Sequence, residues 1–188
     1  MRGETDFTKL LINIRQGENG SSNKLFPLVY DELKRLAYSK LQKERQDITF
    51  TGTSLVHEVY LKMADQSTIQ AKDKNHFLAI AARCMRQILI DHARKKKAQK
   101  RGGDQQDVTY IDELLKAQYE ADQLIDLDEK LDELAQLDER MADVVTLRFF
   151  GRLTISATAD ALDISERTVK RDWAKARGWL YKELKGSK

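Results

Sequence analysis

The sequence of 188 residues contains few of the residues that build sheets and disulfides. It has one proline, nine glycines and one cysteine, and valine plus isoleucine total 18 residues against 40 for leucine plus alanine. A large β-sheet is disfavoured, because strands need β-branched residues and the tight turns between them need glycine and proline. We therefore predict an all-α protein and exclude a β-sandwich or a β-barrel.

The single cysteine and the absence of a long apolar run set further limits. Cys84 has no partner for a disulfide within the chain, which is typical of proteins from a reducing compartment. No run of 18 apolar residues is present, so we expect no membrane insertion. The charged start MRGETDFTKLL lacks the basic-then-apolar pattern of a secretory signal, and we expect a cytoplasmic protein.

Charge is abundant, at 34% of residues, and it is arranged in blocks. Residues 83–101 carry eight basic residues and one acid, residues 104–133 eleven acids and two lysines, and residues 165–188 eight basic residues and three acids. Basic segments on helices are typical of surfaces that bind polyanions such as nucleic acids. The alternative, which charge alone leaves open, is that each block is a solvated helical face.

Hydrophobic periodicity predicts four helices in the first half of the chain, at 6–15, 26–43, 55–65 and 75–100. We predict loops at 46–52 and 66–74, with Thr53 or Ser54 as the N-cap of the third helix, because their hydroxyls accept hydrogen bonds from free backbone N–H groups. The fourth helix should end at Gly102-Gly103. Its buried stripe should comprise Phe77, Ala81, Cys84 and Ile88.

The second half of the chain is also predicted to be helical. Leucines repeat at spacings of three and four from Leu124 to Leu137, and further helices are expected at 138–150, 154–162 and 165–185. Gly151-Arg152 should form a turn. We therefore predict two small helical domains, 1–101 and 124–188, joined by an acidic linker at 102–123.

Catalytic and metal-binding patterns are incomplete. His57-Glu58 begins a zinc-binding HExxH pattern, but Leu61 stands where the second histidine would be. Arg101-Gly102-Gly103 is not followed by the Lys-Ser/Thr of a phosphate-binding loop, and no Gly-x-Ser-x-Gly nucleophile motif occurs. We expect no catalytic residue, no metal and no cofactor.

The segment from Thr154 to Trp173 has the layout of a helix-turn-helix, with a basic second helix. Ala159 is small where the helices should cross, and Ser165 should cap the second helix. The core positions of that helix are predicted to be Val169, Trp173, Ala176 and Leu180. The outward positions, Arg167, Lys170, Arg171, Ala174 and Lys175, would suit a DNA major groove, whereas a helical hairpin with a merely basic surface is the alternative.

These features resemble the sigma-70 family, and within it the small extracytoplasmic-function (ECF) type of bacterial sigma factor. The resemblance covers nearly the whole chain and is carried by LFPLVYDELKRLA (25–37), TSLVHEVYLKM (53–63), HFLAIAARCMRQILIDHARKKKAQKRGG (76–103) and VVTLRFFGRLTISATADALDISERTVKRDWAKARGWL (144–180). Two positions depart from the family pattern, since Asp163 replaces the usual glycine of the corner and Ala157 replaces an acid. Asp tolerates a left-handed backbone better than most residues.

The resemblance implies sigma domain 2 followed by sigma domain 4, and it assigns roles to residues. The helix near 53–65 would bind the clamp helices of the polymerase β′ subunit through His57, Glu58 and Lys62, and domain 4 would contact the β flap. The residues implied for the -10 promoter element are Asn75, His76, Phe77, Arg83, Arg86, Gln87 and Arg94, with Ile90 on the same helix face as Arg83, Gln87 and Arg94. Those implied for the -35 element are Arg167, Thr168, Lys170, Arg171 and Lys175.

The implied function is that of a transcription initiation factor that binds bacterial core RNA polymerase, recognises -10 and -35 promoter DNA and promotes melting. The resemblance suggests an anti-sigma factor or a Ser/Thr kinase as the regulator. Two alternatives remain open: a stand-alone helix-turn-helix transcriptional regulator, and a helical interaction or anti-termination protein. The first alternative would leave the features of residues 1–101 unexplained.

Overall fold

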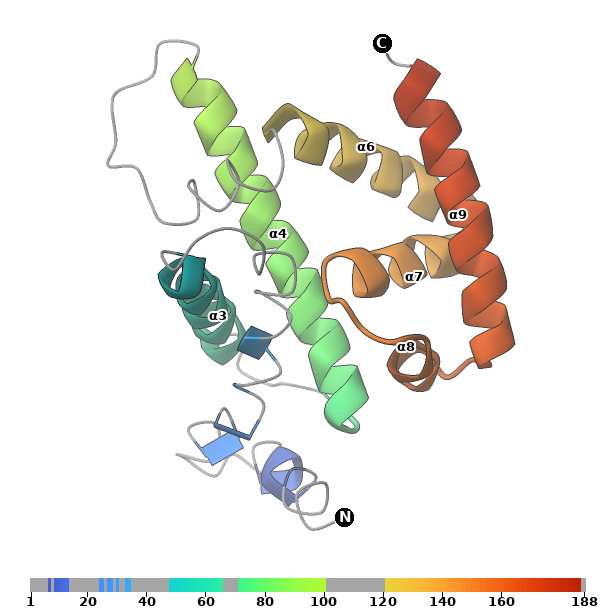
Figure 1. Cartoon of the computed structure of the whole chain (residues 1–188). Helices are drawn as coiled ribbons and strands as arrows, with labels where there is room; N and C mark the ends of the chain where they lie inside the picture. Colours follow the sequence, from blue (N-terminus) through green and yellow to red (C-terminus); the bar gives the residue numbers. More distant parts are fainter. Residues whose placement is uncertain are drawn as a thin grey trace.

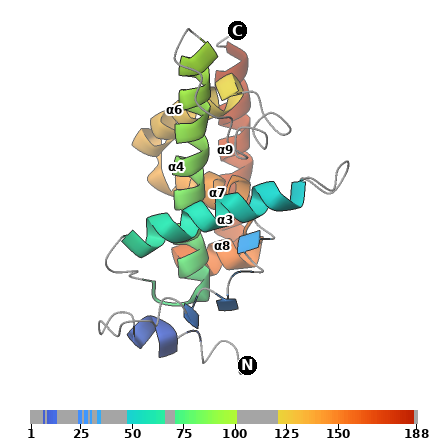
Figure 2. The same cartoon turned by 90° about the vertical axis from the view of Figure 1, so that its left-hand side faces the viewer.

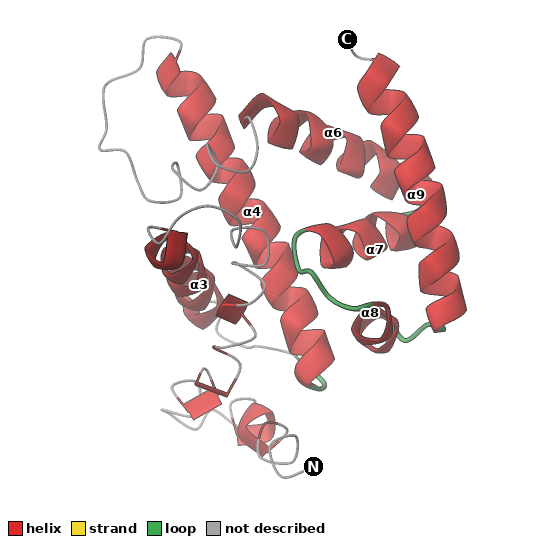
Figure 3. Cartoon of the chain, in the orientation of Figure 1, coloured by secondary structure: helices red, strands yellow, loops and turns green. Residues whose placement is uncertain are grey.

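The computed structural model describes residues 7, 9–13, 24–25, 27–28, 30, 33–34, 48–65, 71–100 and 121–186. Its main elements in chain order are α3 (Ile48–Asp65), α4 (Lys74–Lys100), α6 (Ala121–Leu137), α7 (Glu139–Phe149), α8 (Ile155–Leu162) and α9 (Glu166–Gly186) (Figure 1). All regular structure within the described residues is helical, so the predicted all-α class is confirmed (Figure 3). Among these helices, none combines the length and the hydrophobicity needed to cross a membrane.

Helix caps explain why most of the predicted boundaries agree with the structure. Asp138 Oδ1 accepts a hydrogen bond from the N–H of Met141 at 3.1 Å, which starts α7. Thr154 Oγ1 accepts from the N–H of Ala157 at 3.1 Å and starts α8. Each bond satisfies a backbone donor in the first helical turn that has no partner within the helix.

The start of α3 was predicted wrongly. The helix begins at Ile48, so it includes most of the predicted loop at 46–52 and both of the proposed N-cap residues, Thr53 and Ser54. Glycine, serine and threonine weaken a helix by no more than about 1 kcal/mol each. Packing of the rest of the helix, through Leu55 and Val56, is sufficient to override such small preferences.

Several other predictions fall partly or wholly outside the described residues. Of the predicted loop 66–74, residues 71–73 are non-helical and Lys74 already belongs to α4, whereas 66–70 are not described. The described residues of 6–15 and 26–43 are helical. Gly102-Gly103 and most of the predicted linker 102–123 are not described, although residues 121–123 belong to α6.

α4 is the central element of the fold. α3 crosses it on one side (Figure 2), while α6, α7 and α8 pack against its other side. α9 lies beyond them and contacts α6, α7 and α8 (Figure 1). The two halves of the chain, which were predicted to form separate domains, therefore pack against each other along α4.

A large hydrophobic core extends through both halves. It runs from Phe7 to Leu180 and includes the predicted stripe of α4, with Phe77 packed edge-on against Phe7 at a ring-centroid distance of 5.6 Å. Burial raises the pKa of the Cys84 thiol above its usual value and outweighs the opposing charge of Lys62. The division at 102–123 stays a prediction, but the two parts share buried surface in this structure.

Gly151 is a point of close approach between the two halves. It follows α7, and a Cβ atom at this position would overlap Cβ of Ala82 on α4 and lie 2.8 Å from the carbonyl oxygen of Leu147. Real Cβ atoms do not approach other atoms so closely, so only glycine fits here without a shift of the backbone.

Candidate nucleic-acid interface

α8 and α9 form the predicted helix-turn-helix. Asp163 ends α8 in the left-handed conformation, with φ 55° and ψ 46°. The N–H of Ile164 donates to the carbonyl oxygen of Ala159 at 3.0 Å, which satisfies an end group of α8. At the crossing, Ala159 packs in a small buried cluster with Val144 and Val169. Asp163 thus adopts the left-handed conformation that the sequence analysis expected it to tolerate.

The two faces of α9 are sharply different. Val169, Ala176 and Leu180 are buried, as predicted, whereas Trp173 is only half-buried. The guanidinium groups of Arg148 and Arg177 lie 5.5 and 5.8 Å from the centre of the Trp173 ring. The opposite face exposes four of the residues proposed for the -35 element: Arg167, Lys170, Arg171 and Lys175. The fifth, Thr168, is half-exposed and shares a 2.9 Å hydrogen bond with Ser165, the residue that caps α9.

Sequence reasoning missed Asp172, which is 2% exposed on the inner side of α9. Its carboxylate accepts hydrogen bonds from Nε of Arg140 at 2.7 Å and from Nε of Arg171 at 3.1 Å. Burial alone would raise the pKa of Asp172, but the two guanidinium groups outweigh burial and hold the pKa below its usual value. The available signal was spacing, since Asp172 falls three residues after Val169 and four before Ala176, on the core stripe.

The basic face of α4, which was proposed for the -10 element, lies against α6 and α7. Arg83 forms a two-point contact with Asp143 of α7, with Nε–Oδ1 and Nη2–Oδ2 distances of 3.3 and 2.9 Å. Arg86 donates to Asp128 and Asp132 of α6 at 2.8 and 2.7 Å. Arg94 also reaches Asp128, at 2.9 Å. Ile90 is 2% exposed, whereas Gln87 is exposed.

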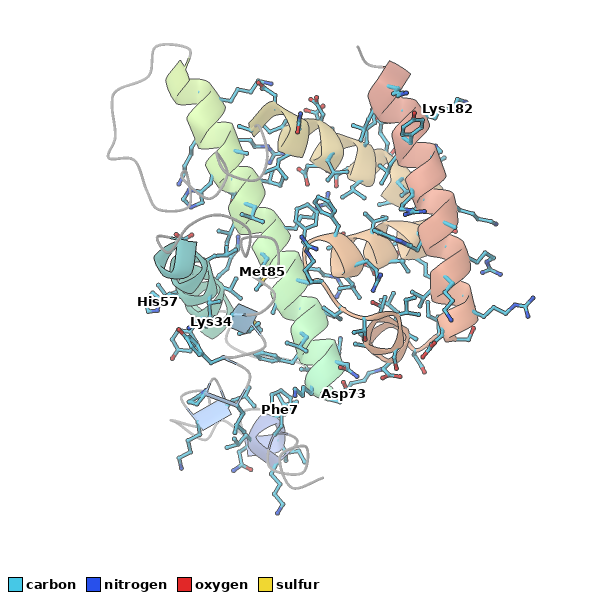
Figure 4. All side chains as sticks on the ribbon, in the orientation of Figure 1. Phe7, Lys34, His57, Asp73, Met85 and Lys182 are labelled. Atoms are coloured by element: carbon cyan, nitrogen blue, oxygen red, sulfur yellow. The ribbon has the colours of Figure 1, made fainter. Side chains whose placement is uncertain are left out.

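A pocket of about 500 Å³ lies among these side chains, between α3, α4, α6 and α7. Its lining is almost entirely charged or polar, and its cations are matched by carboxylates. Lys62, Arg83, Arg86 and Arg94 line it together with Asp91, Asp128, Asp132 and Asp143. Side chains from both sides occupy the space between α4 and the pair α6 and α7 (Figure 4). The positive charge that Arg83, Arg86 and Arg94 bring to this pocket is therefore matched by carboxylates within the molecule.

The N-terminal end of α4 contains the other residues proposed for the -10 element. Asn75 donates to Oδ2 of Asp160 on α8 at 3.0 Å, and Nδ1 of His76 accepts from the N–H of Lys72 at 3.1 Å. Phe77 is 1% exposed in the core. Its proposed contact with DNA is not compatible with this packing, because an aromatic ring held by the core cannot stack on a base without unpacking.

The face of α3 proposed to bind polymerase differs in part from the prediction. His57 is exposed and lies on the outer side of α3 (Figure 4). Glu58 and Lys62 are only partly exposed, because both contact α4. Oε2 of Glu58 lies 3.2 Å from Nε2 of His92, and Nζ of Lys62 lies 3.9 Å from Oδ2 of Asp91. Leu61, one helical turn from His57, has half of its surface exposed and was not among the residues predicted for this face.

Comparison with protein families matches residues 4–186 to the ECF sigma factor family, which leaves out only the first three and last two residues. Comparison with individual curated proteins gave no match. ECF sigma factors are transcription initiation factors without enzymatic activity, and they work with RNA polymerase and promoter DNA. Anti-sigma factors are their typical regulators. From the extent of the match and the helix-turn-helix geometry, we conclude that the chain belongs to the ECF sigma factor family.

Proposed function

We propose that this protein directs bacterial core RNA polymerase to promoters by reading the -35 element with α9 and the -10 element with α4. In the same complex it promotes melting of the DNA near the start site. The observation that carries this proposal is the helix-turn-helix of α8 and α9, in which one face of α9 is buried and the opposite face exposes four cations.

The exposed face of α9 has the chemistry that a major groove requires. Arginine and lysine donate to the acceptors on guanine edges and to phosphate oxygens. Ala174 is exposed between Arg171 and Lys175, and its small side chain leaves room for close approach to the DNA. Arg171 is fixed near its guanidinium by Asp172, so less conformational freedom is lost when it binds a base.

The -10 element would be bound by α4. Arg83, Arg86 and Arg94 provide phosphate contacts along the helix, and Gln87 provides a neutral hydrogen-bonding group among them. Asn75 and His76, at the start of the helix, would contact a base that has left the duplex. Extruding a base costs a few kcal/mol, so a site that binds the extruded base favours melting.

Core polymerase would dock on α3 through the face that carries His57 and Leu61. The exposed Leu61 supplies apolar area that Glu58 and Lys62 do not. A central apolar contact with a polar rim is the usual composition of a specific protein interface.

Transcription by purified bacterial core polymerase on promoters with intact and scrambled -35 elements tests the proposal. Arg171→Ala should cost about 1–3 kcal/mol of recognition on the intact promoter and little on the scrambled one. Lys182→Ala is the matched control, since Lys182 is exposed near the other end of α9 (Figure 4).

An equal fractional loss on both promoters would mean that Arg171 does not read the -35 element. Tight and sequence-specific DNA binding by the free protein at physiological salt, with no stimulation of polymerase, would instead favour a stand-alone transcriptional regulator.

A further inference from the structure

We propose that Asp172 is a positioning residue for promoter recognition. It fixes the guanidinium group of Arg171 in the orientation that reads one base pair of the -35 element, and Arg140 holds Asp172 in place. This inference deepens the proposed function and rests on it, because it assumes that α9 reads the -35 element. It assigns a part of the sequence specificity to a side chain that is buried and does not touch the DNA itself.

The carboxylate of Asp172 connects α7 to the exposed face of α9. Its Oδ2 accepts a hydrogen bond from Nε of Arg140 at 2.7 Å, and its Oδ1 accepts one from Nε of Arg171 at 3.1 Å. The side chain of Asp172 is 2% exposed, whereas those of Arg140 and Arg171 are 45% and 55% exposed. One oxygen is therefore bound by the packed interface, and the other by the residue proposed to contact DNA.

Asp172 stands on the core stripe of α9, where an apolar residue would be expected. Val169 and Ala176, on the same stripe, are buried. A buried carboxylate is unfavourable unless it is paired, and the two guanidinium groups hold the pKa of Asp172 below its usual value in spite of burial. The carboxylate is thus ionised at neutral pH. Departures from apolar core patterning concentrate at functional sites, which favours a role beyond packing.

The contact at Nε leaves the donors that read guanine available. A guanidinium group carries one Nε–H and two terminal amino groups, Nη1 and Nη2. Within the part of the chain that the structure describes, Arg171 bonds to Asp172 through Nε, and its terminal amino groups have no partner. Two parallel donors match the O6 and N7 acceptors of guanine in the major groove. We therefore expect Arg171 to contact one guanine end-on, through Nη1 and Nη2.

The same contact disfavours the competing use of Arg171, which is binding to phosphate. A freely rotating arginine can bind any phosphate oxygen within its reach, and such contacts carry no sequence information. The bond to Asp172 restricts the side chain and places a negative charge beside the guanidinium group, which weakens its attraction to phosphates. Specificity is a difference between two affinities, so weakening the non-specific contact raises specificity.

Asp172→Asn tests the proposal in the full-length protein with purified core polymerase. The amide has one acceptor oxygen where the carboxylate uses two, so one of the contacts with Arg140 and Arg171 is lost. Either loss loosens Arg171, through its own bond or through the anchor on α7. Promoters randomised over the -35 element are transcribed and the products sequenced, which gives the base preference at every position. Arg171→Ala identifies the position that Arg171 reads, because the preference there should disappear.

The proposal predicts that Asp172→Asn lowers the base preference at that position by about two- to tenfold and leaves the other -35 positions unchanged. Transcription from promoters with a scrambled -35 element should not fall, because the freed Arg171 can bind phosphates and the net charge is more positive. Partial unfolding would instead lower transcription from every promoter by the same factor. An unchanged preference at this position, with or without such a uniform loss, would overturn the proposal.

A double-mutant cycle shows whether Asp172 acts through Arg171. In the Arg171→Ala background, Asp172→Asn should cause no further change in base preference. In the Arg167→Ala background it should keep its full effect, because Arg167 is exposed on the same helix and has no contact with Asp172 among the described residues. Equal effects of Asp172→Asn in the two backgrounds would overturn the positioning role.

A measurement on the wild-type protein keeps the proposal testable if Asp172→Asn does not fold. Side-chain NMR with ¹⁵N labelling reports the exchange of each arginine Nε–H with water, and Arg171→Lys identifies the signal of Arg171 by its loss. The Nε–H of Arg171 should exchange about tenfold more slowly than that of Arg167, since it is bonded to a buried carboxylate. Equal exchange rates would show that the contact with Asp172 does not hold Arg171 in solution and would overturn the proposal.

The outcomes separate the positioning role from the proposed function. If Arg171→Ala removes the preference at one -35 position and Asp172→Asn leaves it unchanged, only the positioning role fails. If Arg171→Ala removes no preference while the wild-type protein still directs initiation, the assignment of Arg171 fails and the positioning role with it. If the wild-type protein supports no initiation with core polymerase on the promoter library, the proposed function itself fails.

Discussion

Replacing Asp172 by asparagine removes the buried charge that links α7 to α9 while preserving side-chain size. The carboxylate is 2% exposed and accepts hydrogen bonds from Arg140 and Arg171. Hydrogen bonds to charged groups contribute about 1.5–3 kcal/mol each. The two arginine side chains are 45% and 55% exposed, so water can solvate them after the substitution, and removal of the buried charge offsets part of the loss. We expect a net decrease of about 2 kcal/mol in the free energy of unfolding.

The pH dependence provides an independent check. The pKa of Asp172 is lowered in the folded state, so its stabilising contribution is present above the usual pKa of an aspartate and is lost as pH falls through the folded value. Denaturant unfolding at pH 7 should therefore show the full difference between the wild-type protein and Asp172→Asn. The difference should shrink as the pH falls below about 4.

The control for this experiment is Asp126→Asn, an exposed carboxylate on α6, which should change the free energy of unfolding by less than about 0.5 kcal/mol. Equal stability of Asp172→Asn and the wild-type protein at pH 7 would show that the two guanidinium contacts contribute nothing net. A destabilisation that stays constant from pH 7 into the acid range would refute the assignment of the effect to the ionised carboxylate.

Three further outcomes are expected. Gly151→Ala should destabilise the protein by about 1–3 kcal/mol in thermal unfolding, because the added methyl group meets Ala82 and a backbone oxygen. Gly178→Ala has open space around it in α9 and should stabilise the protein by about 0.5–1 kcal/mol. Similar effects of the two substitutions would contradict the packing at Gly151. Cys84 should react with a thiol reagent only after unfolding, and rapid labelling of the native protein would be inconsistent with its burial. The pKa of the Cys84 thiol is raised in the folded state, so the free energy of unfolding should decrease as the pH rises from the usual pKa of the thiol to the folded value. His57→Ala/Leu61→Ala should weaken competition for core polymerase without altering helical content by circular dichroism, and undiminished competition would exclude this face of α3.

Local signals predicted much of the fold. The period of apolar residues identified α4, α6 and α7 with small boundary errors, because each helix buries one continuous stripe. Thr154 and Ser165 were correctly placed at helix starts, where a hydroxyl satisfies a free backbone donor. The start of α3 was not predictable in this way, since Gly52, Thr53 and Ser54 resemble a helix boundary and only the packing of the whole helix overrides them.

The interface contained information that local signals could not supply. The basic block of 83–101 and the acidic block of 104–133 were both recognised, but the basic block was assigned to DNA, and the acidic block to the linker at 102–123 and to the solvated face of the helix that follows it. Asp128, within the acidic block, instead pairs with Arg86 and Arg94 of the basic block. Complementary charge in sequence does not specify which oppositely charged groups meet, because this depends on how helices far apart in the chain pack.

The core shared by the two halves gives their association a temperature dependence. Separation of α4 from α7 exposes apolar side chains such as Ala82, Ile90 and Phe150 to water, and hydration of apolar surface raises the heat capacity. Hydrophobic association weakens on cooling, so the contribution of this shared core to the contact between the two halves should decrease as the temperature falls. The packing of α7 on α4 should therefore be more stable at moderate temperature than near freezing.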